Sequence, residues 1–231
     1  MNQFIRTELL IGKKNMELLK NSSIIIFGIG GVGSYVAEAL ARCQISNFTF
    51  VDNDKIDASN INRHICANVN TIGQLKIDAM KRRVLKINPD AKVTVINKFV
   101  NAENIFEIFD KNFTYAVDAV DTVSSKIQII LTAKKLKIPI ISCMGTGNKI
   151  NPLSLKLDDI YKTKYCPLAK IMRRELKKYG VKSLQVCYST EQPKKILTSE
   201  KKLISSISFV PSVAGLFIAS AIVNQIIDYE T

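Results

Sequence analysis

The stretch from Ser23 to Asp54 constrains the fold of this chain more than any other part of it. It opens with the apolar run Ile24–Phe27, which has the length and composition of a buried strand. A glycine-rich turn of the G-x-G-x-x-G type follows, and a segment with helical apolar periodicity begins at about residue 34. The glycines of this turn are Gly28, Gly30, Gly31 and Gly33.

A second predicted strand, Phe48–Val51, ends on the acid Asp52, which lies 19 residues beyond Gly33. Strand, glycine turn, helix, strand and acid in this order are typical of a nucleotide-binding βαβ unit. In such a unit the helix N-terminus faces the phosphates, and the acid accepts a hydrogen bond from a ribose hydroxyl. We therefore expect a nucleotide site here, with an ordinary α/β core around a glycine-rich turn as the alternative.

The rest of the chain fits the same fold class. Apolar strands and amphipathic helices alternate up to about residue 142, which predicts an α/β fold with a doubly wound, mostly parallel sheet. Expected helices cover 4–20, 73–87, 102–110 and 123–136, and expected strands cover 92–97, 114–117 and 139–142. Beyond residue 145 we expect a strand over 153–157, a cation-rich helix over 166–179, a strand over 183–188 and a basic loop over 191–202.

The charge balance favours an anionic partner. Thirty-three Lys and Arg residues against 20 Asp and Glu residues give a formal net charge of +13. An excess of this size is typical of proteins that bind nucleic acid, although a basic proteome or a need for solubility would also produce it. The five cysteines form no C-x-x-C pair, which argues against a disulfide framework and against a structural zinc site.

One uncharged segment, from Leu203 to Ile227, reaches the length of a membrane span. Polar residues and Pro211 interrupt it, and only about 17 residues after that proline can be helical. We expect a buried C-terminal core helix with no stable membrane span, packed through a face of small residues: Ala214, Gly215, Ala219 and Ser220. Because the opening MNQFIRTELL lacks the apolar core of a signal peptide, we expect a cytoplasmic protein.

Five separated elements make the first half resemble the E1-like superfamily of ATP-dependent adenylating enzymes. The glycine turn is the first, and the others are Asp52-x-Asp54, Ser59-Asn60-x-Asn62-Arg63, Lys76 and Asp118-x-x-Asp121. The resemblance covers residues 23–145 and implies a Rossmann-like, E1-like fold that binds ATP and Mg²⁺. It suggests one domain over 1–231, with an ATP-binding core over 1–145. A small basic elaboration, including the C-terminal core helix, covers 146–231.

The same resemblance assigns roles to individual residues. Arg63 and Lys76 are expected to be catalytic cations at the phosphates, and Asp121 to be catalytic and to hold Mg²⁺. Asp52 is expected at the ribose and Asp54 elsewhere in the nucleotide site, while Asn60 is expected to position the triphosphate. Attack of a carboxylate on ATP brings two anions together, so fixed cations and a metal belong beside the phosphates. Taken singly, Arg63 and Lys76 are typical surface cations.

The second half resembles one group within that superfamily, the tRNA threonylcarbamoyladenosine dehydratases. These enzymes use ATP to activate the threonyl carboxylate of a modified adenosine beside the tRNA anticodon, and the carbamoyl group then closes a ring with net loss of water. The similar segments are Arg6–Gly12, Asp158–Leu168, the basic helix through Tyr179, Val186–Glu191 and Val210–Val223. A tRNA substrate would explain the cationic stretches at 170–178 and 194–202.

The resemblance further implies a homodimer and leaves open a sulfur-relay protein partner and a monovalent cation (K⁺ or Na⁺). The main alternative is an adenylyltransferase that activates the C-terminus of a ubiquitin-like sulfur-carrier protein, against which the missing C-x-x-C pairs count. A nicotinamide-dependent oxidoreductase and a nucleic-acid-binding module without catalysis are further alternatives. An oxidoreductase would not explain why Arg63, Lys76 and Asp121 occur together with the glycine turn.

Four residues have open roles at this point. His64 stands where the family usually has Gln, and we expect a loop residue near the nucleotide rather than a general base. Cys187 is either a small buried residue or a thiol that captures an acyl adenylate. Arg6 is either a surface cation or a residue that reaches a neighbouring subunit's site, and Asp118 could simply cap the next helix.

Overall fold

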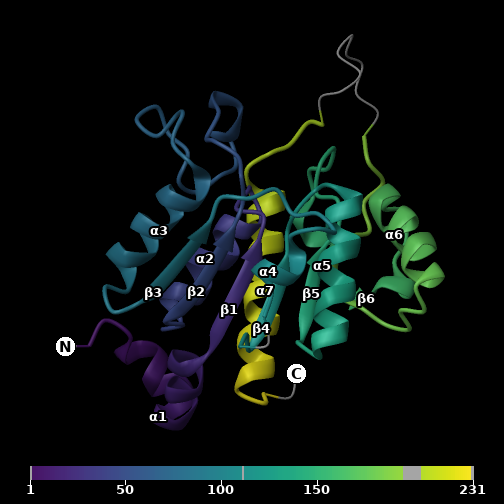
Figure 1. Cartoon of the computed structure of the whole chain (residues 1–231). Coiled ribbons are helices and arrows are strands. Elements are labelled where there is room, and N and C mark those ends of the chain that lie inside the picture. Colours follow the sequence, from purple (N-terminus) through teal and green to yellow (C-terminus); the bar gives the residue numbers. More distant parts are fainter. Residues whose placement is uncertain (1, 111, 195–203, 230–231) are drawn as a thin grey trace.

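Seven strands form one sheet through the centre of the part of the chain that the structure describes (Figure 1). This computed structural model describes residues 2–110, 112–194 and 204–229. The strands are β1 Ser23–Phe27, β2 Asn47–Val51, β3 Lys92–Ile96, β4 Tyr115–Asp118, β5 Ile140–Cys143, β6 Leu155–Asp159 and β7 Gln185–Ser189. Their order is β3-β2-β1-β4-β5-β7-β6, and every neighbouring pair is parallel except β6 and β7, so the predicted mostly parallel sheet is confirmed.

Helices cover both faces of this sheet. They are α1 Ile5–Asn21, α2 Gly33–Arg42, α3 Lys76–Ile87, α4 Ile105–Ile108, α5 Val123–Leu136, α6 Pro167–Lys178 and α7 Phe209–Ile226. Alternate residues of β1 point to opposite faces, because side chains of a strand alternate. Ile24 and Ile26 belong to a core that includes residues of α2, α3 and α7, whereas Ile25 and Phe27 belong to a core with α4, α5 and α6.

The second half of the chain adds to both the sheet and one of its faces. Strand β7 pairs with β5, and β6 forms the antiparallel edge. Helix α7 returns to the first core, where a Cβ built on Gly215 would lie 2.6 Å from the carbonyl oxygen of Val32 at the start of α2. The helix therefore packs closely against α2, as the expected C-terminal core helix should.

Among the described residues, α7 is the single helix whose length and apolar composition would suffice to cross a membrane, and 50% of it is buried in the protein. Its small residues Ala214, Gly215 and Ala219 are buried as expected, whereas Ser220 is exposed. The helix starts at Phe209, two residues before Pro211, which sits in its first turn. Proline is tolerated there because the first N–H groups of a helix have no intrahelical acceptor.

Several boundaries differ from the sequence-based expectation by two residues or more. Helix α4 spans only Ile105–Ile108 where a helix over 102–110 was expected, and β7 begins at Gln185 rather than at residue 183. Helix α3 begins at Lys76 rather than at residue 73, because Gly73 has a φ of +84° and Leu75 forms an antiparallel bridge with Lys55. Strand β6 begins at Leu155 rather than at residue 153, because Pro152–Ser154 forms a short 3₁₀ turn. Of the expected basic loop over 191–202, residues 195–202 lie outside the described part of the chain.

The carboxyl ends of the parallel strands lie at one end of the sheet, and α1 lies at the other (Figure 1). Loops that leave β1, β2, β4 and β5 therefore meet at the same edge. In doubly wound folds this edge holds the ligand.

Candidate active site

A cavity of about 860 Å³ opens at the carboxyl ends of the strands. Its nucleotide end is lined by the glycine turn and by Asp52, Asp54, Arg63, Lys76 and Asp121, together with Ala119–Thr122 after β4. Its other end, which we name the β5 end, is lined by residues 143–149 after β5 and by residues 166–168 at the start of α6. The structure thus brings together most of the residues predicted from sequence. Gly33 and Asn60 are not among the lining residues.

Two positions in the glycine turn exclude any side chain. Gly28 has a φ of +87°, and a Cβ there would lie 2.7 Å from the carbonyl carbon of Ala119. Gly33 lies so close to the carbonyl oxygen of Gly28 that a Cβ on it would meet that atom at 1.9 Å. Val32, the N-cap of α2, supplies no side-chain acceptor, so the N-terminus of α2 is presented to the cavity, as in nucleotide-binding turns.

The peptide groups of Ile29, inside this turn, are held from both sides. Asp52 Oδ2 accepts the N–H of Ile29 at 2.7 Å, and Asp52 Oδ1 accepts the N–H of Asp54 at 2.8 Å. On the other side, His64 Nε2 lies 2.8 Å from the carbonyl oxygen of Ile29. His64 Nδ1 accepts the N–H of Cys66, so the ring proton is on Nε2 and is donated to Ile29.

His64 is therefore a buried positioning residue. Burial, with a smaller contribution from the neighbouring charges of Lys76 and Arg63, lowers its pKa to about 4, so the ring is neutral near pH 7. It does not line the cavity, and both ring nitrogens are engaged within the protein. A general base would need a nitrogen within reach of the substrate, so the geometry does not support that interpretation.

Asp52 keeps capacity for a ligand. Burial raises the pKa of its carboxyl group, and the Lys76 charge and the two backbone N–H groups oppose that effect. Each carboxylate oxygen accepts one backbone hydrogen bond, while an ionised carboxylate has about four acceptor sites. A hydrogen bond from a ribose hydroxyl is thus compatible with the contacts that Asp52 already makes.

Arg63 lies across the glycine turn. A Cβ on Gly31 would lie 3.0 Å from Arg63 Cγ, which places the arginine stem directly over this glycine. The guanidinium Nη1 donates to the carbonyl oxygen of Ser59 at 2.8 Å and to Asn62 Oδ1 at 3.0 Å. The arginine stem therefore lies on the turn at the cavity wall, while the guanidinium is held by its own loop.

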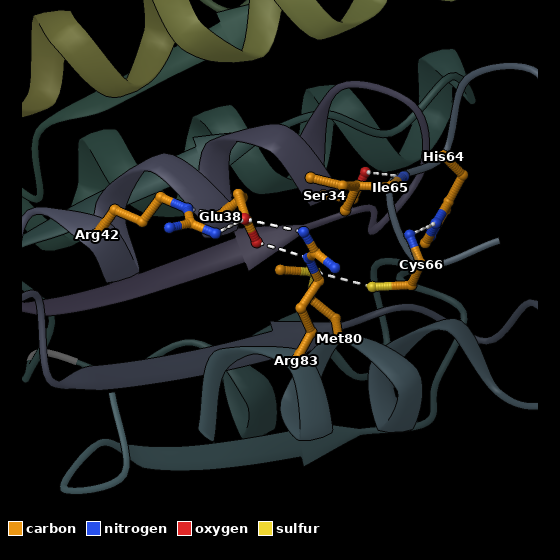
Figure 2. Close-up of polar contacts among 8 residues, drawn as sticks. All are labelled: Ser34, Glu38, Arg42, His64, Ile65, Cys66, Met80 and Arg83. Atoms are coloured by element: carbon orange, nitrogen blue, oxygen red, sulfur yellow. Dashed lines mark hydrogen bonds and ion pairs between the residues drawn. The ribbon is translucent and has the colours of Figure 1, made fainter. Parts of the chain in front are cut away.

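The segment His64–Cys66, which follows Arg63, is fixed to α2 and α3 (Figure 2). The N–H of Ile65 lies 3.5 Å from Ser34 Oγ on α2, and Cys66 Sγ lies 3.5 Å from Met80 Sδ on α3. These contacts, with the His64 hydrogen bonds, limit the freedom of the backbone that carries Arg63.

An ion cluster around one buried carboxylate fixes α3 to α2 (Figure 2). The carboxylate of Glu38 on α2 is buried and accepts hydrogen bonds from Arg83 on α3 at 2.7 and 3.0 Å. Arg42, one turn along α2, forms a second ion pair with Glu38 at 2.8 Å. Because α3 also carries Lys76 at its first position, this cluster helps to set where Lys76 stands relative to the glycine turn.

Lys76 faces the cavity in an ion pair. Its side chain is buried, and Nζ lies 2.6 Å from Asp54 Oδ2, whose own side chain is exposed. The pair holds the ammonium group at the cavity wall. Asp54 is therefore placed as a positioning partner for Lys76.

Asp118 does not cap the next helix. Thr122 is the N-cap of α5, and Asp118 instead forms a fully buried ion pair with Lys126 at 3.0 Å. Its Oδ2 also accepts the Ser142 hydroxyl at 2.5 Å, and Lys126 donates to the carbonyl oxygens of Val120 and Cys143 at 3.0 and 2.8 Å. This network fixes the loop that carries Asp121.

Asp121 lies exposed on that loop and lines the cavity. Within residues 2–110, 112–194 and 204–229, no group of three or more His, Cys, Asp or Glu side chains is placed to hold a metal. Mg²⁺ is commonly bound through one or two carboxylates together with substrate phosphates. A single carboxylate in the same cavity wall as the glycine turn fits that mode of binding.

Three other candidate residues lie outside the cavity wall. Asn60 uses its side-chain oxygen to accept the N–H of Asp57 at 3.1 Å and does not line the cavity. Cys187 is fully buried, and burial beside Cys143 raises the pKa of its thiol well above the ordinary value. Arg6 is exposed on α1, away from this chain's own cavity.

Sequence reasoning missed two charged residues of the cavity, Lys98 at the nucleotide end and Lys149 at the β5 end. The side chain of Lys149 is almost fully buried. The only signal for Lys149 in the sequence was its place just after Gly145-Thr146-Gly147, at the carboxyl end of a predicted strand. Nothing in its immediate neighbours distinguished it from the many surface lysines.

Comparisons with known proteins point to one family. The tRNA threonylcarbamoyladenosine dehydratase of Bacillus subtilis is 40% identical over 242 residues, covering 98% of this chain and 95% of that protein. Two solved structures of the Escherichia coli tRNA N6-threonylcarbamoyladenosine dehydratase TcdA, in complex with AMP and with ATP, match with TM-scores of 0.92 and 0.91. Each is 31% identical to this chain and covers 98% of it and 94% of the solved chain.

The family model described as ThiF family matches residues 4–231. It thus spans the sheet, the cavity and the C-terminal core helix, and the solved relatives share the same E1-like fold. The chain belongs to the ThiF family.

Proposed function

We propose that this protein uses ATP to dehydrate N6-threonylcarbamoyladenosine beside the anticodon of tRNA. The observation that carries this proposal is that Arg63, Lys76 and Asp121 line one cavity together with the glycine turn. That combination suits adenylation of a carboxylate, since cations stand where negative charge develops. The relative that matches nearly the whole chain bears the name of this activity.

In the first step, an oxygen of the threonyl carboxylate attacks the α-phosphorus of ATP. A bond forms between that oxygen and phosphorus, the bond from the α-phosphorus to its bridging oxygen breaks, and pyrophosphate leaves. The N-terminus of α2 and the side chains of Arg63 and Lys76 stabilise the charge on the phosphoryl oxygens. Asp52 orients the ribose, and Asp52 and His64 together keep the Ile29 peptide of the turn in place.

In the second step, the carbamoyl group of the same nucleoside attacks the activated carbonyl carbon. The new bond closes a ring, a proton passes to solvent, and AMP leaves with one of the original carboxylate oxygens. The sum of both steps is loss of one water from the nucleoside, with ATP converted to AMP and pyrophosphate. No thioester is needed, which agrees with the buried position of Cys187.

We propose Asp121 as the ligand that holds Mg²⁺ together with the nucleotide phosphates. When bound, the ion supplies positive charge that offsets the negative charge of the phosphates. A monovalent cation, K⁺ or Na⁺, remains part of the proposal through the family resemblance alone.

The basic surface supports a tRNA substrate. On α6, Arg174 and Lys178 pair with Glu175, so part of the positive charge of this helix is neutralised locally. Lys170 and Lys177 on the same helix are exposed and, among the described residues, form no ion pair, so they are better placed for phosphate contacts. The residues 166–168 at the start of α6 line the cavity, so a bound tRNA backbone could run along this helix with one base in the site.

We further propose a homodimer in the cytoplasm. Leu9 and Leu10 are 79% and 84% exposed on α1, and Leu216 and Phe217 are exposed on α7. Apolar residues of this size on a helix surface are typical of subunit interfaces. Arg6 on α1 would then be able to approach the partner's cavity, and a sulfur-relay protein would bind elsewhere on the dimer.

The proposal is tested by mass spectrometry of tRNA nucleosides. The protein is incubated with ATP, Mg²⁺ and tRNA that carries the threonylcarbamoyl group, and the nucleosides are compared before and after. We expect a nucleoside lighter by one water and one AMP released per nucleoside converted. An unchanged nucleoside mass with folded, ATP-binding protein would contradict the proposal.

The alternative, activation of a ubiquitin-like sulfur carrier, is less well supported. The sequence has no C-x-x-C pair, and the relative that covers 98% of the chain is a dehydratase. Exchange of label between pyrophosphate and ATP that depends on a sulfur-carrier protein, and not on tRNA, would favour this alternative.

A further inference from the structure

The two ends of the cavity differ in charge. Asp52, Asp54 and Asp121 line the nucleotide end, as do the cations Arg63, Lys76 and Lys98. At the β5 end, Lys149 is the single charged residue among the described residues of the wall. This end therefore offers one positive group and no described carboxylate to an incoming ligand.

Lys149 is buried to an unusual degree for a lysine. Its exposed fraction is 3%, and Nζ donates to the carbonyl oxygen of Gly145 at 2.8 Å. An ammonium group has three N–H donors, and lysine is rarely this buried without an acidic partner. Gly145 supplies the one hydrogen-bond acceptor that the described part of the chain gives it.

The carboxylate of Glu191 does not supply Lys149 with a second hydrogen-bond acceptor. Glu191 faces Lys149, but its oxygens accept the N–H groups of Ile150 and Asn151 at 2.8–3.1 Å. No ion pair joins Glu191 to Lys149 among the described residues. The thiols of Cys143, Cys166 and Cys187 are the other titratable groups that face the amine.

The start of α6 adds positive potential at the same place. Cys166, the N-cap of this 12-residue helix, makes no side-chain cap hydrogen bond, and Cys166–Leu168 line the cavity. A Cβ on Gly145 would lie 3.7 Å from Cys166 Sγ, so the loop that carries Lys149 and the helix start are in contact. Helix N-termini favour anions.

We propose that Lys149 binds the carboxylate of the threonyl group of the substrate and holds it at the β5 end, facing the α-phosphorus of ATP. The inference rests on the proposed function and names the residue that selects a tRNA bearing this carboxylate. Lys149 would thus be a specificity-determining residue, separate from the phosphate-binding cations. The competing role is purely structural, in which Lys149 only anchors its loop through Gly145.

The test is equilibrium binding of tRNA in the absence of ATP, so that no turnover occurs. Three anticodon stem-loops serve as probes: one with threonylcarbamoyladenosine, one with the same group as its uncharged carboxamide, and one with unmodified adenosine. The wild-type protein should bind the carboxylate form more tightly than the carboxamide by about tenfold or more, as for a buried charge-assisted contact. Equal affinity of the wild type for these two would overturn the inference.

Substitutions test whether Lys149 causes the preference for the carboxylate form over the carboxamide. Lys149→Met should reduce the ratio of the two affinities to about one, and Lys149→Arg should keep part of it. Lys134→Met, which removes one exposed lysine near the end of α5, is the matched control for loss of one charge and should keep the full ratio. A Lys149→Met protein that retains the ratio, or that loses affinity for all three probes equally, would contradict the inference.

The measurements distinguish failure of the proposed function from failure of the proposed role of Lys149. ATP affinity and thermal unfolding are measured on each variant, and Lys149→Arg provides the test if Lys149→Met does not fold. If wild-type protein yields no dehydrated nucleoside, the proposed function fails. If it yields that product while Lys149→Met still discriminates the carboxylate, only the role of Lys149 is refuted.

Discussion

His64 Nε2 lies 2.8 Å from the carbonyl oxygen of Ile29, so the sole histidine of the chain donates to the glycine turn instead of facing the ligand. Asp52 holds the N–H of the same residue at 2.7 Å. The turn is thus shaped by two side chains that come from opposite sides of it. Both contacts are made within the protein itself, so they limit the conformational freedom of the turn.

The buried His64 predicts an acid-sensitive fold. Its pKa is lowered from 6.5 to about 4, so the unfolded chain binds a proton more readily than the folded one as pH falls. The stabilising contribution is complete above about pH 6.5 and is lost as pH falls towards 4, by up to about 3 kcal/mol. Urea unfolding between pH 7 and pH 4 should show this loss in the wild type and a smaller loss in His64→Gln. Equal pH dependence of the two proteins would refute it.

The buried pair of Asp118 and Lys126 predicts a strong and asymmetric effect on stability. Lys126→Met leaves Asp118 as a buried charge without its partner, which should cost about 3–5 kcal/mol of the free energy of unfolding. The double variant Asp118→Asn, Lys126→Met removes both charges and should recover part of that loss. Urea denaturation measures both, and a Lys126→Met protein as stable as the wild type would show that the pair is unimportant.

Arg63 is predicted to act on turnover more than on tRNA binding. Arg63→Ala should reduce kcat by about a hundredfold or more, because it removes a charge that stabilises the transition state. Affinity for tRNA should change little, since one cation among 33 Lys and Arg residues contributes modestly. Single-turnover kinetics and filter binding measure the two quantities. A variant with unchanged kcat would remove Arg63 from the catalytic site.

Cys187 is predicted to be dispensable for the reaction. Its thiol is fully buried and has a raised pKa, so a thiolate nucleophile is disfavoured. Cys187→Ala should therefore keep kcat within about twofold while losing about 1 kcal/mol of stability from the smaller side chain. Loss of activity in a stably folded Cys187→Ala protein, or an acyl group found on Cys187, would favour a thioester route instead.

Local patterns were sufficient to predict the parallel sheet and the part of the cavity formed by the glycine turn and Asp52. The apolar run before Gly28, the glycine turn and the acid at Asp52 are close in sequence, and their spacing already implies strand, turn and strand. Arg63, Lys76 and Asp121 could be placed only through the family resemblance, because their approach to the turn depends on how distant loops fold.

The contacts that hold the site could not be read from the sequence. His64 meets Ile29 across 35 residues, and Lys126 meets the carbonyl oxygen of Cys143 across 17 residues. Such pairs arise when the sheet assembles and leave no periodic signal in the chain. The boundary at Lys76 was misplaced for a related reason, since the extended Leu75 pairs with the distant Lys55.

The central claim is that the substrate carboxylate attacks the α-phosphorus of ATP in the cavity above the glycine turn. It is tested most directly with tRNA whose threonyl carboxylate carries oxygen-18, followed by mass spectrometry of the released nucleotide. We predict AMP that contains one labelled oxygen for each dehydrated nucleoside. Unlabelled AMP, or label found in inorganic phosphate together with ADP, would contradict the claim.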